Sequence, residues 1–223
     1  MNSLNQHNSK FRCALFDLDG VVFDTESQYS VFWGGVFRRY YPGTEGLEQK
    51  IKGQTLVQIY DGYFKDDKKR QDDITRGLND FEQHMGFPFI PGFEAFVADL
   101  RRHGVKTAVV TSSNRKKMEA VYRQHGNMDE LFDAILTSED FERSKPDPDC
   151  YLKGAQRFGM QKDECVVFED SFNGLKSGQS AGMFVVGLAT TNAADAIAPY
   201  ADCVVDDFRG LDYGRLCELK EKQ

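Results

Sequence analysis

The chain has 223 residues, of which 40% are hydrophobic and 28% charged, and its formal net charge is −7. A chain of this length buries enough apolar surface to fold without disulfides or a structural metal. The acidic balance argues against nucleic acid or an anionic membrane as partner, and no apolar run reaches the ~18 residues of a membrane span. Five scattered cysteines without a CxxC pair indicate reduced, mostly buried thiols in a cytoplasmic protein.

The N-terminal part of the chain changes character along its length. The first ten residues, "MNSLNQHNSK", are polar and lack the hydrophobic stretch of a signal peptide, so we interpret them as a loose tail. Residues 11–17 predict a short buried strand. From Glu26 to Met85, the apolar residues of "SQYSVFWGGVFRRY" and "LVQIYDGYF" are spaced as on helix faces. Pro88 and Pro91 in "GFPFIPG" then indicate a turn or linker.

After Gly92, predicted helices and strands alternate. The helices are "FEAFVADLRRHG", "NRKKMEAVYRQHG", "DPDCYLKGAQRFG" and "SFNGLKSGQSAG", and the strands are "VKTAVVT", "DAILTS", "CVVFED", "MFVVGLA" and "DCVVD". The third helix is expected to have Asp147 as its N-cap and Pro148 in its first position. This alternation predicts an α/β fold, a Rossmann-like parallel sheet with helices on both faces.

The helical segment that precedes this alternation is too long for an ordinary connection, whose loops run to about 2–6 residues. We therefore expect an inserted, all-helical second domain. The predicted division is a flexible tail at 1–10, an α/β core formed by 11–24 and 91–223, and the helical domain at 25–90.

The carboxyl ends of the predicted strands are polar, and in open parallel sheets ligands bind at these ends. They carry acidic and hydroxyl side chains and, in the loop "ERSKPDP", one lysine. These residues are Asp17 and Asp19 after the first strand, Thr111, Ser112 and Ser113 after "TAVVT", Glu169 and Asp170 at the end of "CVVFED", and Lys145 in the loop.

Four carboxylates at one edge of a sheet require compensation. Two like charges at ~4 Å repel by ~4 kcal/mol at a surface-like dielectric. Mg²⁺ is the natural compensator, because it binds through carboxylates, waters and phosphate oxygens. The hydroxyls and free N–H groups near Thr111 form an anion site, and Lys145 can hold a second charge of that anion. Together these groups predict phosphoryl transfer.

Four motifs, "DLDGV", "VVTSS", "SKPDP" and "FEDSFNG", follow one another along the chain. Their order and spacing resemble the haloacid dehalogenase-like superfamily, in its β-phosphoglucomutase-like branch of small phosphatases and sugar phosphomutases. The resemblance extends from Phe11 to about Leu216. It implies that the inserted helical segment is a cap that closes over the site and selects the leaving group.

The resemblance also implies residue roles. Asp17 would be the nucleophile that forms an aspartyl phosphate, and Asp19 the general acid and base. Thr111 and Lys145 would hold the transferring phosphoryl group, supported by Ser112. The implied Mg²⁺ ligands are the Asp17 carboxylate, the Asp19 backbone carbonyl and Asp170, with Glu169 as a further ligand or behind the ligands. The residues expected to bind substrate or phosphate are Ser112, Asn114, Lys52, Gln54 and Thr55.

Each of these residues also has an ordinary structural interpretation. "DG" after the first strand is a turn signal, and a single Lys145 is typical of a surface. The cluster of Thr111 to Ser113 can be an N-cap, and Glu169 and Asp170 can cap the helix that follows them. The combination at several strand ends favours catalysis. Three other functions fit this sequence less well. A signalling receiver domain lacks the inserted helical segment. A catalytically inactive binding module would not need all the catalytic positions intact, and a dehalogenase lacks this metal-site pattern.

Hydrolase and sugar phosphomutase remain as alternatives within the resemblance. β-Phosphoglucomutases carry an arginine three residues after the glycine of "IKGQTLVQIY" and a histidine ten residues after the acid–base aspartate. Leu56 and Tyr29 stand at these positions here, although three lysines of the helical segment, Lys50, Lys52 and Lys65, are candidate replacements. We therefore predict a cytoplasmic Mg²⁺-dependent hydrolase of a small phosphorylated metabolite, with no nucleic acid, membrane or obligate protein partner.

Overall fold

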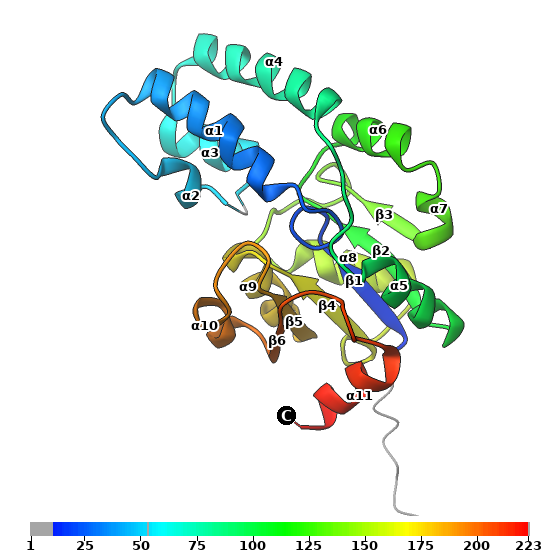
Figure 1. Cartoon of the computed structure of the whole chain (residues 1–223). Coiled ribbons are helices and arrows are strands. Elements are labelled where there is room, and N and C mark those ends of the chain that lie inside the picture. Colours follow the sequence, from blue (N-terminus) through cyan, green and yellow to red (C-terminus); the bar gives the residue numbers. More distant parts are fainter. Residues whose placement is uncertain (1–10, 53, 223) are drawn as a thin grey trace, which may run out of the picture.

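The computed structural model describes residues 11–52 and 54–222, and the predicted tail at 1–10 lies outside them. Its core is a six-stranded parallel sheet with the strand order β3-β2-β1-β4-β5-β6 (Figure 1). The strands are β1 Cys13–Phe16, β2 Lys106–Val110, β3 Ala134–Leu136, β4 Cys165–Glu169, β5 Phe184–Leu188 and β6 Cys203–Val205. The predicted Rossmann-like α/β fold is confirmed.

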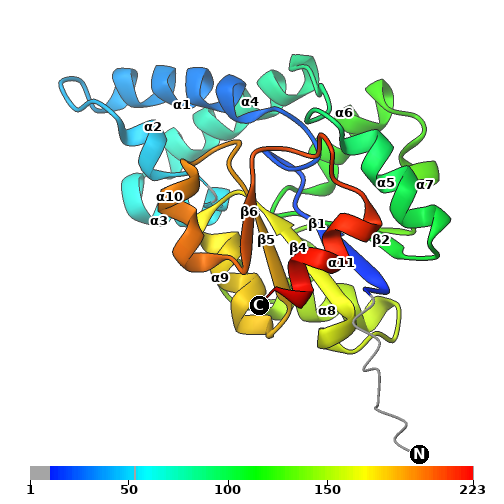
Figure 2. The ribbon, with the colours of Figure 1, turned by 60° about the horizontal axis from the view of Figure 1, so that its bottom comes forward.

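Helices cover both faces of the sheet (Figure 2). One face packs against α5 Phe93–Arg102, α6 Arg115–Gln124, α7 Met128–Leu131 and α11 Tyr213–Glu221. The other packs against α8 Asp149–Arg157, α9 Phe172–Ala181 and α10 Ala194–Ile197, with two 3₁₀ turns at Lys162–Glu164 and Ala198–Tyr200. Successive side chains of a strand point to opposite faces, so Ala14 and Phe16 enter one core and Cys13 and Leu15 the other.

Stacked phenylalanines fix the register at the centre of the sheet. Phe16 of β1 and Phe168 of β4 are paired residues whose rings stack with centroids 4.7 Å apart. Phe96 and Phe208 pack over them from the same face. Such ring pairs contribute about 0.5–1.5 kcal/mol beyond their buried area. Because Asp17 and Glu169 directly follow the stacked pair, their position side by side is set by this packing.

A helical layer lies over the carboxyl end of the sheet (Figure 1). It consists of α1 Glu26–Tyr40, α2 Leu47–Lys50, α3 Leu56–Tyr63 and α4 Lys68–His84, and it has its own hydrophobic core around Trp33 and Phe37. The chain enters and leaves this layer side by side. Asp24 N–H donates to Pro88 O at 2.8 Å, and Ile90 N–H donates to Val22 O at 3.0 Å. The predicted boundaries at 24/25 and 90/91 fall at these crossings, and the division into two domains stays a prediction.

The structure differs from the sequence expectations at one helix start and in three helices that were not predicted. Helix α8 begins at Asp149, with Pro148 in the N-cap position. Asp147 does not cap it as predicted, because its Oδ1 accepts the N–H of Asp149 at 3.0 Å, two residues on, and so forms a turn before the helix. Helices α7, α10 and α11 were not predicted, and Asp212 caps the last of them.

The remaining composition-based expectations concern membranes and thiols. Within residues 11–52 and 54–222, no helix combines the length and apolarity that crossing a membrane requires. All five cysteines are free thiols, and three of them, Cys13, Cys150 and Cys165, are buried. The expectation of reduced, mostly buried thiols agrees with this arrangement.

Gly178 provides a test of how closely α9 packs on the sheet. A Cβ at Gly178 would lie 2.8 Å from Val185 Cγ2 and 3.2 Å from Val167 Cγ1. Gly35, on the exposed side of α1, has no such neighbour within 4 Å. We expect Gly178→Ala to be less stable than Gly35→Ala by about 1–3 kcal/mol, because overpacking opposes the helix propensity that both variants gain. Urea unfolding measures the difference, and equal stabilities would contradict this packing.

Candidate active site

The predicted site residues meet at the boundary between the sheet and the helical layer. A cavity of about 490 Å³ opens there. It is lined by all of the predicted site residues except Glu169, which is fully buried beneath it. The lining residues of this set are Asp17, Asp19, Lys52, Gln54, Thr55, Thr111, Ser112, Asn114, Lys145 and Asp170. Side chains that are up to 153 positions apart in the sequence therefore share one chamber, as the strand-end rule predicts.

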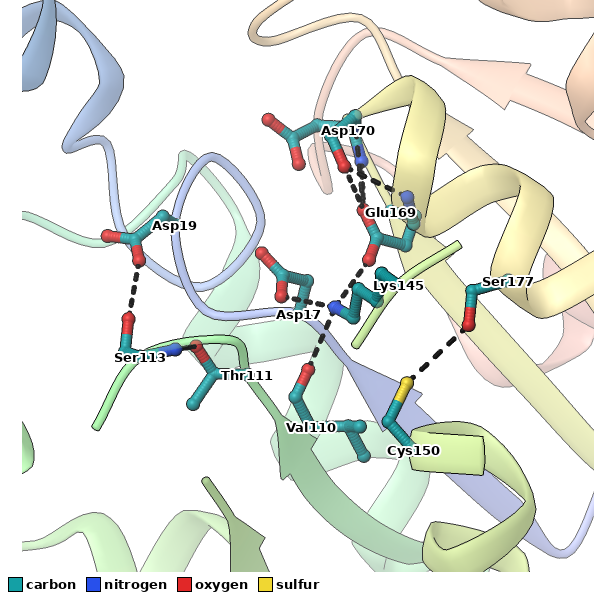
Figure 3. A network of polar contacts seen from close by, with 12 residues as sticks. Asp17, Asp19, Val110, Thr111, Ser113, Lys145, Cys150, Glu169, Asp170 and Ser177 are labelled. Carbon is teal, nitrogen blue, oxygen red and sulfur yellow. Dashed lines mark hydrogen bonds and ion pairs between the residues drawn. The ribbon is translucent and has the colours of Figure 1, made fainter. Parts of the chain in front are cut away.

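Lys145 lies at the centre of a network of polar contacts (Figure 3), and it lines the cavity. Its ammonium donates to Asp17 Oδ1 at 2.6 Å, to Glu169 Oε1 at 2.6 Å and to the Val110 carbonyl at 3.1 Å. These three acceptors match the three donors of a lysine. Burial opposes the charged form, but the charges of Asp17 and Glu169 outweigh it and raise the pKa of Lys145. Lys145 is therefore a permanent cation at the floor of the site.

Glu169 is held on every side. Its Oε1 accepts from Lys145 and from the Tyr151 hydroxyl at 2.6 Å, and its Oε2 accepts from Asp170 N–H at 3.2 Å and from the Ser171 hydroxyl at 3.2 Å. Glu169 was predicted either as a metal ligand or behind the ligands. Since both oxygens are already engaged, its geometry favours the second position, in which it orients Lys145.

Three carboxylates gather where Mg²⁺ was predicted. One oxygen each of Asp17, Glu169 and Asp170 lies within 4.8 Å of the other two. Burial raises the pKa of Asp17 to about 7, with Lys145 opposing and Glu169 reinforcing the shift. Burial and then the charges of Glu169 and Asp17 raise the pKa of Asp170. Three acids with one lysine leave negative charge uncompensated, so a hard divalent cation fits this donor set.

Asp170 is supported by residues that the sequence analysis missed. Asn192 donates to the Asp170 carbonyl at 2.9 Å, and Thr190 donates to the Gly20 carbonyl at 2.5 Å. Gly20 has φ +75°, and a Cβ on it would lie 2.1 Å from Asp170 Oδ2. Only glycine therefore lets the loop after β1 approach Asp170. Because Thr190 and Asn192 follow β5 closely, the strand-end rule could have found them.

Asp19 lies apart from this carboxylate group (Figure 3). Its Oδ1 accepts from the Thr25 hydroxyl at 2.5 Å, and its Oδ2 accepts from the Ser113 hydroxyl at 3.1 Å and from the Lys117 ammonium. The Asp19 side chain is thus positioned away from the three-carboxylate cluster. This separation is compatible with the two predicted roles of Asp19, in which its side chain transfers protons and its backbone carbonyl binds the metal.

The turn between β2 and α6 forms the wall beside Asp17. Thr111 is buried, and its Oγ1 accepts from Ser113 N–H at 3.0 Å. Asn114 is the N-cap of α6, where its Oδ1 accepts from Lys117 N–H at 2.9 Å. The cap therefore lies at Asn114 and not in the cluster of Thr111 to Ser113 for which it was considered, and only the amide NH₂ of Asn114 remains for the predicted contact with phosphate. Ser112 lines the cavity between them.

The helical layer supplies the opposite wall. Thr55 caps α3 in a reciprocal pair with Gln58, and Gln54 donates to the Lys50 carbonyl at 3.0 Å. Gln58 also donates to the Lys145 carbonyl at 3.2 Å, which joins α3 to the loop that carries Lys145. Lys52, which the resemblance suggested for substrate binding, lines the cavity with them.

Three further residues of the site were missed from the sequence, namely Tyr151, Glu82 and Lys117. Tyr151 is fully buried and holds Glu169, while Glu82 accepts from the Tyr29 hydroxyl at 2.9 Å. Lys117 carried a usable signal, because it lies three and four residues before the buried Ala120 and Val121 of α6. Helical periodicity places it on the buried face.

The sequence matches the family described as "Haloacid dehalogenase-like hydrolase" over residues 14–188. Hexitol phosphatase A of Escherichia coli is 31% identical over 180 residues, which are 78% of this chain and 81% of that protein. Validoxylamine A 7'-phosphate phosphatase of Streptomyces hygroscopicus is 28% identical over 205 residues, which are 88% of this chain and 94% of that protein.

Among solved structures, a HAD hydrolase of family IA, variant 3, from Entamoeba histolytica superposes with a TM-score of 0.83 at 20% identity, covering 95% of this chain and 100% of that one. This likeness shows the fold, and the family match shows the lineage. The superfamily resemblance seen in the four sequence motifs is confirmed. The chain belongs to the haloacid dehalogenase-like hydrolase family, and it is a hydrolase whose curated relatives include phosphatases.

Proposed function

We propose that this protein is a Mg²⁺-dependent phosphatase that hydrolyses the ester of a small phosphorylated metabolite through an aspartyl phosphate on Asp17. One observation carries the proposal: Asp17 is ion-paired to the buried Lys145, beside Asp170, at the floor of a cavity that also contains Asp19. One chamber is thus lined by a proposed nucleophile, a cation for the phosphate, a candidate metal ligand and an acid–base group.

The first step is attack of an Asp17 carboxylate oxygen on the phosphorus of the bound ester. The new bond joins this oxygen to phosphorus, and the bond from phosphorus to the leaving oxygen breaks. Asp19 gives its proton to that leaving oxygen, so the alcohol departs neutral. Lys145, whose three donors bind Asp17, Glu169 and the Val110 carbonyl, supplies positive charge beside the transferring phosphoryl group. Thr111 holds that group in line with Asp17.

The second step releases phosphate. A water molecule attacks the phosphorus of the aspartyl phosphate and loses its proton to Asp19, which regains the proton it gave in the first step. The bond between phosphorus and Asp17 breaks, and the carboxylate is restored. Two modest barriers replace one high barrier, provided that one positioned group serves as acid and then as base.

The residues suited to hold Mg²⁺ are Asp17, Asp170 and the backbone carbonyl of Asp19, with Glu169 behind them. Two partly free carboxylates and a carbonyl are hard oxygen donors of the kind that this ion prefers. When bound, Mg²⁺ neutralises charge on the transferring phosphoryl group.

We propose residues 25–90 as a cap that selects the leaving group. Their wall of the cavity presents Lys52, Gln54 and Thr55, which suit a hydroxyl-bearing leaving group such as a sugar. Hexitol phosphatase A and validoxylamine A 7'-phosphate phosphatase are named for phosphate esters of this kind. A sugar phosphate or a similar polar ester is therefore the proposed substrate.

A sugar phosphomutase is the second candidate, and the cavity wall favours hydrolysis over it. Leu56 stands where the mutases carry their phosphate-gripping arginine, and Tyr29, in place of the histidine, donates its hydroxyl to Glu82. Glu26, Glu48 and Glu82 also line the cavity. These carboxylates would repel the second phosphate that a mutase must retain.

The proposed setting is the cytoplasm, supported by five free thiols. A net charge of −7 disfavours nucleic acid as a partner. The proposal needs neither a membrane nor an obligate protein partner, since the described site is assembled within one chain.

Asp17→Asn is expected to abolish turnover while leaving the fold intact, because an amide cannot form the acyl phosphate. Asp24→Asn, an exposed change in the same loop, is the matched control and should behave as wild type. Phosphate release from a panel of sugar, hexitol and aryl phosphates measures activity, and hydroxylamine-labile protein-bound phosphate reports the intermediate. Retention of a tenth of the wild-type rate by Asp17→Asn would remove Asp17 from this role.

Mg²⁺ is expected to raise the melting temperature by about 5–10 °C at a hundredfold excess over its Kd, because linkage then contributes about 2.7 kcal/mol. Asp170→Asn should melt higher than wild type in EDTA, since repulsion is relieved, and should gain little from Mg²⁺. Asp195→Asn, on the exposed side of α10, should keep the wild-type response. Thermal scans with and without Mg²⁺ measure both effects, and an identical wild-type melting temperature in the two would count against the site.

Hydrolysis and isomerisation are distinguished by product. Incubation with β-glucose 1-phosphate, Mg²⁺ and a trace of the 1,6-bisphosphate should give free phosphate or no reaction, because the cavity wall is poorly suited to a second phosphate. Coupled assays follow phosphate and glucose 6-phosphate in parallel. Rapid formation of glucose 6-phosphate with little free phosphate would establish the mutase instead.

A further inference from the structure

A second buried lysine stands on the acid–base side of the cavity. Lys117 lies on the inner side of α6 and is 2% exposed. Its ammonium contacts Asp19 Oδ2 and lies 4.6 Å from the centroid of the Tyr29 ring. Burial raises the pKa of Glu82, and the positive charge of Lys117 opposes this shift. The ammonium is thus enclosed by core and helical layer together.

A buried ammonium is retained only where a counter-charge compensates its lost hydration. Asp19 supplies that counter-charge for Lys117, as Asp17 and Glu169 do for Lys145. These two buried lysines therefore pair with different aspartates of the site, Lys145 with Asp17 and Lys117 with Asp19. Lys145 fixes the nucleophile, and Lys117 fixes the group that moves protons.

Lys117 differs from the other donors to Asp19. Thr25 and Ser113 offer neutral hydroxyls, which rotate and also accept hydrogen bonds. The Lys117 ammonium only donates, and its positive charge adds an ion pair to the hydrogen bond. Tyr29 of α1 stacks against the ammonium and is in turn bonded to Glu82 of α4. The position of the Lys117 side chain therefore depends on the helical layer as well as on α6.

We propose that Lys117 is a positioning residue for the reaction, holding the Asp19 carboxylate in place from between the core and the helical layer. The inference rests on the proposed function. In this geometry Lys117 does not contact the Asp17–Lys145 pair that would bind the phosphoryl group. Its removal should consequently act on kcat and leave phosphate binding intact.

The test uses 4-nitrophenyl phosphate as substrate and full-length protein with Mg²⁺. Lys117→Met should lower kcat by roughly 10–100-fold, less than the ~10²–10⁴-fold expected for Asp19→Ala, which removes the acid–base group itself. KM and the inhibition constant of inorganic phosphate should stay within about threefold of wild type. Lys117→Arg, which keeps the charge, should recover part of the lost rate. Lys116→Met is the matched control, because it removes an exposed lysine from the same helix and should behave as wild type.

A double-mutant cycle separates positioning from a structural role. Adding Lys117→Met to Asp19→Ala should cause little further loss, because the group that Lys117 positions is already gone. An equal fold-loss in both backgrounds would overturn the proposal, as would a Lys117→Met enzyme with wild-type kcat or with a change confined to KM. Circular dichroism and melting temperature check folding, and if Lys117→Met fails to fold, Lys117→Gln takes its place in the cycle.

The same experiment keeps the two proposals apart. Failure of the proposed function is seen in wild type, as absence of turnover across the ester panel and of protein-bound phosphate. The Lys117 inference fails if the wild type is active but Lys117→Met does not lower its rate. It also fails if Lys117→Met causes the same fold-loss in the wild-type and Asp19→Ala backgrounds.

Discussion

The ion pairs of Lys145 with Asp17 and Glu169 are the interaction on which the rest of the site depends. All three groups are nearly or fully buried, and their side chains come from the ends of β1 and β4 and from the loop before α8. Burying one of these charges alone would cost several kcal/mol, so each is retained only with its partners. The stacked Phe16 and Phe168 rings beneath them fix the two strand ends at the spacing that one ammonium can bridge.

The charge balance of the site is unfavourable for stability, because its carboxylates repel one another. One lysine does not neutralise Asp17, Glu169 and Asp170, and the pKa of Asp17 is raised to about 7 chiefly by burial. A protein without a reaction to perform would be more stable with fewer carboxylates here. The uncompensated charge fits the proposed binding of a divalent cation and, through it, of a phosphate. Under the proposed function, this region is less stable than it could be because it binds an ion and a charged substrate.

The helical layer contributes to the site by direct contact as well as by enclosure. Gln58 of α3 donates to the carbonyl of Lys145, and Tyr29 of α1 packs on Lys117. Each of the two buried lysines is therefore touched by a helix of this layer. Such contacts give a physical means by which the position of the layer can affect both the Asp17 side and the Asp19 side of one cavity. A substrate enclosed between layer and sheet would meet both.

The sequence alone determined the parallel α/β fold and the strand-end set of Asp17, Asp19, Thr111, Glu169 and Asp170, and the loop motif "SKPDP" added Lys145 by resemblance. Strand ends follow from local periodicity, and parallel strands bring their carboxyl ends to one edge whatever the details of packing. Tertiary structure alone decided how these groups pair. Three pairings depend on how helices dock and rotate on the sheet. Glu169 accepts from Lys145 and Tyr151, Asn114 caps a helix, and Lys117 contacts Asp19, 98 positions away in the sequence. Those rotations are set by side-chain packing between distant segments, for which periodicity within any one segment carries no information.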